Sequence, residues 1–151
     1  MFNNLMSMFK SKKSSEPSQF FKDGTIEVAC IFIRVGKLDN HLAASEKEKI
    51  NALLCKRFDL NKDNLNLILT KAAEMELNLN DNVQLTKKIK KHIKFEARFD
   101  LLKDIWEIIL ADEIKSHEEQ AYMRLLCNLL GLSDKDNAVA RKDVLKANEK
   151  K

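Results

Sequence analysis

One unit of sequence occurs twice in this chain of 151 residues, and the repetition constrains the fold more than any other feature. In each copy an apolar helical segment ends in an aspartate, a polar loop follows, and a second apolar-striped segment opens with glutamates. The aspartates are Asp39 and Asp112, about 73 residues apart, and Cys55 and Cys127 lie near the ends of the second segments. Repetition at this period predicts two copies of one supersecondary unit that bury their apolar faces on each other.

The composition favours helix along the whole chain. Three Gly and one Pro are too few turn residues for an all-β or loop-rich fold. Apolar residues recur at helical spacing, so we expect an all-α bundle of about seven helices with short connectors. We divide the chain into an amphipathic N-terminal segment and linker (1–23), one helical domain (24–147) and a basic tail (148–151).

Capping residues mark the expected helix boundaries. The polar runs that begin at Asn61 and at Ser133 are each predicted to stop one helix and to cap the next. Two further pairs match the capping box, in which a glutamate accepts a hydrogen bond from the N–H of the cap residue. These pairs are Ser45 with Glu48 and Ser116 with Glu119.

The three cysteines, Cys30, Cys55 and Cys127, form no paired motif, and each lies on an apolar helical stripe. We interpret them as small buried hydrophobic residues in a reducing compartment. No stretch approaches the roughly 20 apolar residues of a membrane span, and the N-terminus lacks the features of a secretory signal. These observations predict a cytoplasmic protein.

The first residues of the chain carry a separate feature. Lysines and a serine-rich linker follow a stripe of four large apolar side chains at helical spacing. The stripe consists of Phe2, Leu5, Met6 and Phe9. A helix this short is stable only against another surface. That surface is the body of this domain, a groove in a protein partner, or a membrane interface, and the sequence leaves these alternatives open.

The formal net charge of +4 is unevenly spread, with a basic run between Lys87 and Arg98. Runs of this kind are usually solvated helix faces, and nucleic-acid binding is the alternative. No recognised nucleic-acid-binding motif accompanies the run. We therefore expect no nucleic-acid partner.

Acidic residues in the two loops are the candidate site. Asp39 and Asp112 follow apolar helices, where the helix macrodipole disfavours a carboxylate by about 0.3–1 kcal/mol. Glu46 and Glu119 lie at equal separations beyond them. One alternative is structural, with each aspartate closing a tight helix–helix corner. The other is a divalent cation, Ca²⁺, Mg²⁺ or Zn²⁺, held by Asp39, Glu46, Asp112 and Glu119.

His41 and His117 also fall in these loops, which raises the alternative of a transition-metal site. They stand at different separations from their aspartates, so we interpret them as exposed loop residues. The spacing of acids in the loops is not that of an EF-hand. The chain has no glycine-rich phosphate loop, nucleophile elbow or HExxH motif, and we expect no enzymatic activity.

These residues resemble the TerB tellurite-resistance-like family, whose fold is shared with the N-terminal domain of the co-chaperone DjlA. The family pattern is an apolar helix ending in Ala-Asp-Gly, an acidic loop and a helix opened by Glu-Glu, present twice. The matching positions are Leu38-Asp39-Asn40, Ala111-Asp112-Glu113, Glu46, Glu118 and Glu119. The glycine is replaced in both loops, and the segment Ile105–Ser133 is similar to the family's C-terminal half.

The resemblance implies an all-helical bacterial module that acts in stress response and in which acidic clusters bind metal. We therefore expect a non-enzymatic TerB-like domain with a divalent cation at its acidic inter-helix loops. The alternative is a peripheral adaptor that docks on a membrane or a protein partner through its N-terminal segment. No His-Pro-Asp tripeptide is present, so the resemblance does not imply the J-domain activity of DjlA.

Overall fold

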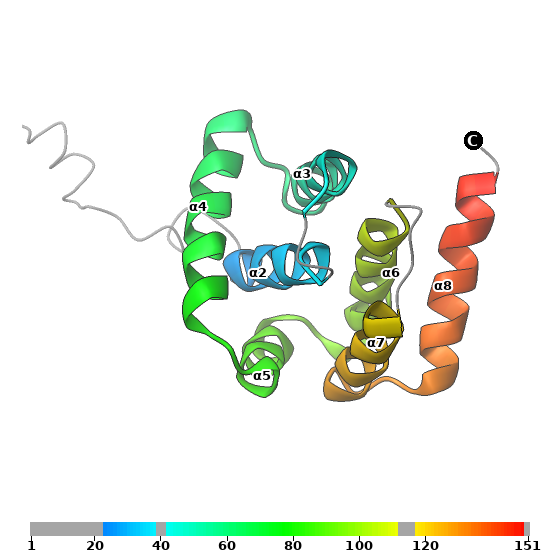
Figure 1. Ribbon diagram of the computed structural model, residues 1–151. Helices are drawn as coiled ribbons and strands as arrows, with labels where there is room; N and C mark the ends of the chain where they lie inside the picture. Colours follow the sequence, from blue (N-terminus) through cyan, green and yellow to red (C-terminus); the bar gives the residue numbers. More distant parts are fainter. Residues whose placement is uncertain (1–22, 39–41, 112–116, 150–151) are drawn as a thin grey trace, which may run out of the picture.

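The computed structural model describes residues 23–38, 42–111 and 117–149 (Figure 1). Within these ranges the chain forms seven α-helices and no β-strand, which confirms the expected all-α bundle. The segment predicted to form an amphipathic helix at the N-terminus lies outside them. The helices are α2 (Thr25–Gly36), α3 (Ala44–Phe58), α4 (Lys62–Asn78), α5 (Asn82–His92), α6 (Phe95–Ala111), α7 (His117–Leu129) and α8 (Asp134–Glu149).

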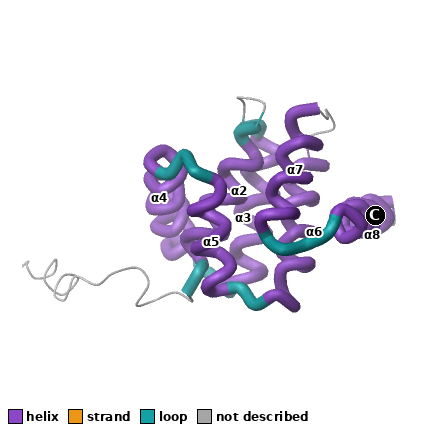
Figure 2. The backbone as a smooth tube through the Cα atoms, turned by 90° about the horizontal axis from the view of Figure 1, so that it is seen from below, coloured by secondary structure: helices purple, strands orange, loops and turns teal. Residues whose placement is uncertain are grey.

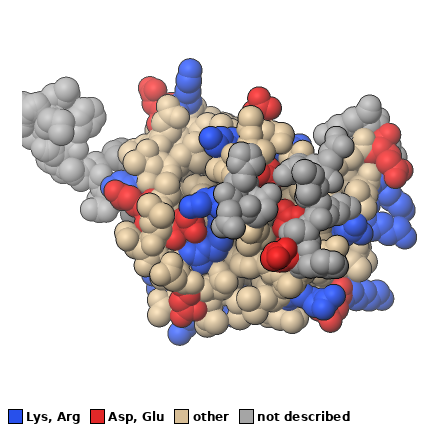
Figure 3. Space-filling view, in the orientation of Figure 1, with Lys and Arg blue, Asp and Glu red and all other residues tan. Residues whose placement is uncertain are grey.

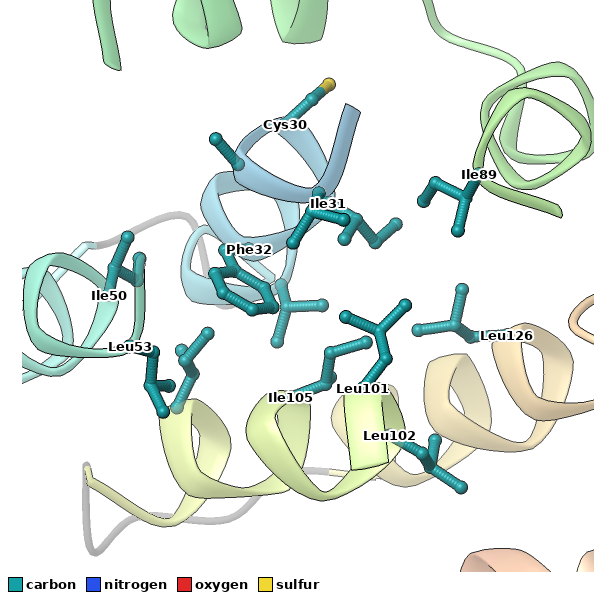
Figure 4. Packing of buried hydrophobic residues seen from close by; sticks show 14 of the residues in the cluster. Cys30, Ile31, Phe32, Ile50, Leu53, Ile89, Leu101, Leu102, Ile105 and Leu126 are labelled. Atoms are coloured by element: carbon teal, nitrogen blue, oxygen red, sulfur yellow. The ribbon is translucent and has the colours of Figure 1, made fainter. Parts of the chain in front are cut away.

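Helix α2 is the centre of the bundle. It packs against α3, α4, α5 and α6, and every residue from Val28 to Gly36 is buried. Figure 4 shows Phe32 between α3 and α6, while Ile89 of α5 approaches α2 from another side. The near-continuous apolar sequence of this segment therefore reflects a helix that is covered on almost all sides.

The two copies of the repeat form similar three-helix units, α2–α3–α4 and α6–α7–α8, with α5 between them. In each unit the first helix makes its most extensive contacts with the third. In each unit the second helix is followed by a residue with positive φ, Asp59 at 54° after α3 and Gly131 at 82° after α7. Helices α2 and α3 both pack on α6, so the units bury apolar faces on each other as the repeat predicts.

The caps predicted at Asn61 and Ser133 are confirmed. The Asn61 side chain accepts a hydrogen bond from the Asn64 N–H at 2.8 Å, at the start of α4. Before α8, the Asp136 N–H donates to Ser133 Oγ at 3.0 Å, and the Ser133 N–H donates to the Asp136 carboxylate at 2.9 Å. Both helices therefore begin where a polar side chain satisfies an N–H group that has no partner within the helix.

The capping box predicted for Ser45 and Glu48 is wrong. Helix α3 begins at Ala44 with Ala43 as its N-cap, so Ser45 already lies inside the helix. The Ala43 N–H donates instead to Glu46 Oε1, at 2.9 Å. The prediction assumed that a hydroxyl side chain marks the cap, whereas here the glutamate satisfies the cap N–H and the cap residue itself offers only a methyl group.

Candidate functional site

The candidate site consists of two acidic corners, one at the start of each second helix of the repeat. We call the first turn of α3, with Glu46, the first acidic corner, and the first turn of α7, with Glu119, the second. Each glutamate is the third residue of its helix. Both are buried, with 0% of Glu46 and 2% of Glu119 exposed, while their acidic neighbours Glu48 and Glu118 are exposed. The buried acidic residue is therefore the third residue of the helix in both corners.

Helical electrostatics favour a carboxylate at this position. The N–H groups of the first turn carry the positive end of the helix dipole, which stabilises a nearby anion. Burial opposes that effect, because a carboxylate removed from water needs compensating contacts. Glu46 obtains one of these from the Ala43 N–H.

Packing at the end of α2 sets the shape of the first acidic corner. A Cβ atom on Gly36 would stand 2.4 Å from Leu42 Cδ1 and 3.4 Å from Ile50 Cδ1. The absence of a side chain on Gly36 therefore lets Leu42 fold back onto the last turn of α2. This close approach brings the start of α3 against the end of α2.

The structure describes only some of the predicted site residues. Asp39, His41 and Asp112 lie outside the described residues, and His117 is the first residue of α7. Figure 2 shows the end of α2 and the start of α7 at the same end of the bundle. Within the described ranges, no three His, Cys, Asp or Glu side chains are grouped so that they could hold a metal ion. A metal site at this end therefore requires ligands in addition to Glu46 and Glu119.

A polar network around Arg34 was not predicted. Arg34 is only 9% exposed, and its Nη1 donates to Asn82 Oδ1 at 2.8 Å. Its Nη2 donates to the backbone oxygens of Leu79 and Glu76, and its Nε donates to the Glu76 carboxylate at 3.4 Å. The signal in the sequence was an arginine within an otherwise apolar helix, since such a charge is buried only when it has partners.

The Arg34 network links four helices. Lys37 forms an ion pair with Glu76 at 2.8 Å, and the Tyr122 hydroxyl donates to Asn82 Oδ1 at 3.1 Å. Burial raises the pKa of Tyr122 to about 12, which keeps the phenol protonated. Arg34 thereby joins α2 to the C-terminal end of α4, to the start of α5 and, through Asn82, to α7. These contacts connect the four helices to one another, and we interpret the network as structural.

Two of the three cysteines, Cys30 and Cys127, are in surroundings that suppress thiol reactivity. Cys30 and Cys127 are buried, as predicted, and Cys55 is half-buried. Burial raises the pKa of both buried thiols to about 11, so the reactive thiolate is scarce at neutral pH. The Cys127 thiol also donates to the Ser133 backbone oxygen at 3.2 Å.

The basic run along α5 and the start of α6 forms a solvated surface, as predicted. Its lysines are exposed, whereas Arg98 is half-buried and donates to the backbone oxygens of Ile93 and Leu130, at 3.1 Å each. Figure 3 shows basic and acidic side chains interspersed across one face of the molecule. In the part of the chain that the structure describes, none of the helices has both the length and the apolar character needed to cross a membrane.

Comparison with known proteins gives one match to a family. The model of the family described as tellurite resistance protein TerB matches residues 25–142, which include α2 to α7 and part of α8. Neither the comparison with curated proteins nor the comparison with solved structures gives a match.

Proposed function

Because this chain belongs to the TerB family of tellurite resistance proteins, we propose that it is a non-enzymatic stress-response module that binds a divalent cation at its two acidic corners. The observation that carries the proposal is the burial of Glu46 and Glu119 at the same position of both units. Asp39 and Asp112, from the loops before these helices, supply the remaining carboxylates.

The chemistry of the donors supports a hard cation. Ca²⁺ and Mg²⁺ are bound by several carboxylate and carbonyl oxygens, and glutamate and aspartate oxygens also bind Zn²⁺. A bound cation would add an opposite charge next to two buried carboxylates, which favours their ionised form. The buried, protonated thiols of Cys30 and Cys127 support the non-enzymatic part of the proposal, because neither is suited to nucleophilic catalysis.

Calorimetric titration with Ca²⁺, Mg²⁺, Mn²⁺ and Zn²⁺ tests this function. We expect saturable binding of at least one ion and a loss of affinity of about tenfold or more in Glu119→Gln and Asp112→Asn. The matched controls are Glu118→Gln and Glu48→Gln, which remove exposed carboxylates near the starts of the same two helices. If no ion binds, or if the control variants lose as much affinity as Glu119→Gln, the cation proposal is wrong.

A second candidate function is that of a peripheral adaptor. Its support is the apolar stripe at helical spacing followed by lysines near the N-terminus, formed by Phe2, Leu5, Met6 and Phe9. Flotation with anionic vesicles compares the full chain with a variant that lacks residues 1–13. The adaptor role predicts that only the full chain floats, and equal partitioning of both proteins contradicts membrane docking.

A further inference from the structure

A surface cleft lies between α7 and α8, with Trp106 of α6 in its wall. Its volume is about 490 Å³, within the range of small-molecule sites. Neither Glu46 nor Glu119 is among the described residues that line it. Five of its seven described lining residues are polar: Gln120 and Arg124 on α7 and Asp134, Asn137 and Arg141 on α8.

Arg141 is held in a defined position in this cleft. Its guanidinium carbon lies over the Trp106 ring, 5.7 Å from the ring centroid, in a cation–π contact. The indole is only 3% exposed, and its Nε1–H donates to Asn137 Oδ1 at 2.9 Å. The ring is therefore fixed, and the fixed ring orients the guanidinium at little further cost in side-chain entropy. The Asn137 amide NH₂ group remains as a further donor.

The two arginines of the cleft are also available to a ligand. Within the described residues, Arg34 and Arg57 form ion pairs with Glu76 and Asp104, whereas neither Arg124 nor Arg141 forms one. Arg124 is exposed on α7 and lines the same cleft. Two guanidinium groups in one cleft, neither ion-paired within the described residues, are suited to bind an oxyanion in a bidentate manner.

Asp134 limits the kind of anion that fits. Its carboxylate lines the same cleft and repels a ligand that is acidic throughout. A hydroxyl or amino group on the ligand would instead donate a hydrogen bond to it. We propose that this cleft binds a small organic oxyanion through Arg124 and Arg141, with a donor group of the ligand next to Asp134.

The single tryptophan of the chain gives a local readout, since Trp106 lies in the wall of the cleft. Fluorescence is titrated with inorganic phosphate, glycerol phosphate and citrate. Comparing glycerol phosphate with citrate separates phosphate from carboxylate ligands. Comparing glycerol phosphate with inorganic phosphate tests whether a hydroxyl group on the ligand strengthens binding. Sodium chloride at equal ionic strength controls for screening. We expect a saturable change for glycerol phosphate or citrate below roughly 10 mM, with weaker binding of inorganic phosphate.

The variants distinguish a site from general charge attraction. Arg124→Gln and Arg141→Gln should each weaken binding about tenfold. Lys71→Gln, an exposed change on α4, should leave it unchanged. Asp134→Asn should tighten the binding of inorganic phosphate, because it removes the repulsive charge.

Arg124 is exposed, so loss of folding does not explain its effect, and thermal unfolding of each variant confirms this. A change in fluorescence that does not saturate for any of the three anions overturns the proposal. Equal effects of Arg124→Gln and Lys71→Gln also overturn it.

Discussion

At the scale of single residues, the buried glutamates of the two acidic corners are the features that most need explanation. The repeat identified Glu46 and Glu119 as equivalent positions, but it did not predict that both would be fully buried. Spacing along the chain determines which residues share a helical turn. Burial depends on helices that are distant in sequence. The cap of α3 was predicted wrongly for another reason: a cap at Ser45 makes Glu48 its partner, whereas the cap at Ala43 makes Glu46 its partner.

The first prediction at this scale concerns the buried thiols. With a pKa of about 11, Cys30 and Cys127 carry about one thiolate per thousand molecules at pH 8. A thiol reagent should therefore label native protein only at Cys55 and unfolded protein at all three cysteines. Rapid labelling of Cys30 or Cys127 under conditions where the protein is fully folded contradicts this.

The same raised pKa values predict a loss of stability at alkaline pH. The ordinary thiol pKa is 9.0, so the folded protein holds these two protons to higher pH than the unfolded chain does. Stability from this source is present below pH 9 and falls as the pH rises from about 9 toward 11. Urea unfolding at a series of pH values measures it. The Cys30→Ala variant should show a smaller fall over this interval.

The third residue-scale prediction concerns the Arg34 network. Replacing Arg34 with alanine leaves the backbone oxygens of Glu76 and Leu79 without their donor, and we expect a loss of about 2–4 kcal/mol in unfolding free energy. Lys37→Ala is the matched control. Lys37 also pairs with Glu76 but its side chain is 43% exposed, so its loss should be below about 1 kcal/mol. Equal losses in the two variants would show that Arg34 is not the centre of the network.

At the scale of helices, the sequence predicted their number and the caps at Asn61 and Ser133, because both rest on local chemistry. The start of α3 was predicted less well, since its cap residue is Ala43 and the side chain that satisfies the cap N–H follows three residues later. The polar network was missed for a different reason. Its partners come from α4, α5 and α7, and no local pattern relates them to Arg34 in α2.

The equivalent ends of α3 and α7 give a prediction at this scale. Asp59 has a φ of 54°, a conformation that costs a residue with a side chain about 1 kcal/mol, whereas Gly131 adopts 82° freely. Asp59→Gly should therefore stabilise the protein by about 0.5–1 kcal/mol, and Gly131→Ala should destabilise it by about 1 kcal/mol or more. A Cβ on Gly131 would meet no atom closer than 3.5 Å, so the effect reports the backbone and not a clash.

Chemical denaturation of the two variants measures both effects. Changes of opposite sign support the view that the two units repeat the same backbone conformation at this position. If Asp59→Gly destabilises the protein, contacts of the aspartate outweigh the strain of its backbone. The two positions would then share a backbone conformation but not its effect on unfolding free energy.

At the scale of the whole molecule, two three-helix units pack on each other around α2, with their acidic corners at one end of the bundle. The sequence predicted this architecture because the repeat, the scarcity of glycine and proline, and the helical spacing of apolar residues all favour the same fold. The candidate site was predicted in part. Its residues follow from the repeat, but the cleft beside Trp106 arises only where α6, α7 and α8 meet.

The central claim, that the two acidic corners bind a divalent cation, is tested most directly by a crystal grown with Mn²⁺. An anomalous difference map of that crystal locates the ion. The account predicts an anomalous peak within coordination distance, about 2.1–2.4 Å, of a carboxylate oxygen of Glu46 or Glu119. A map in which Mn²⁺ binds elsewhere, or in which neither corner shows a peak at saturating ion, would contradict it.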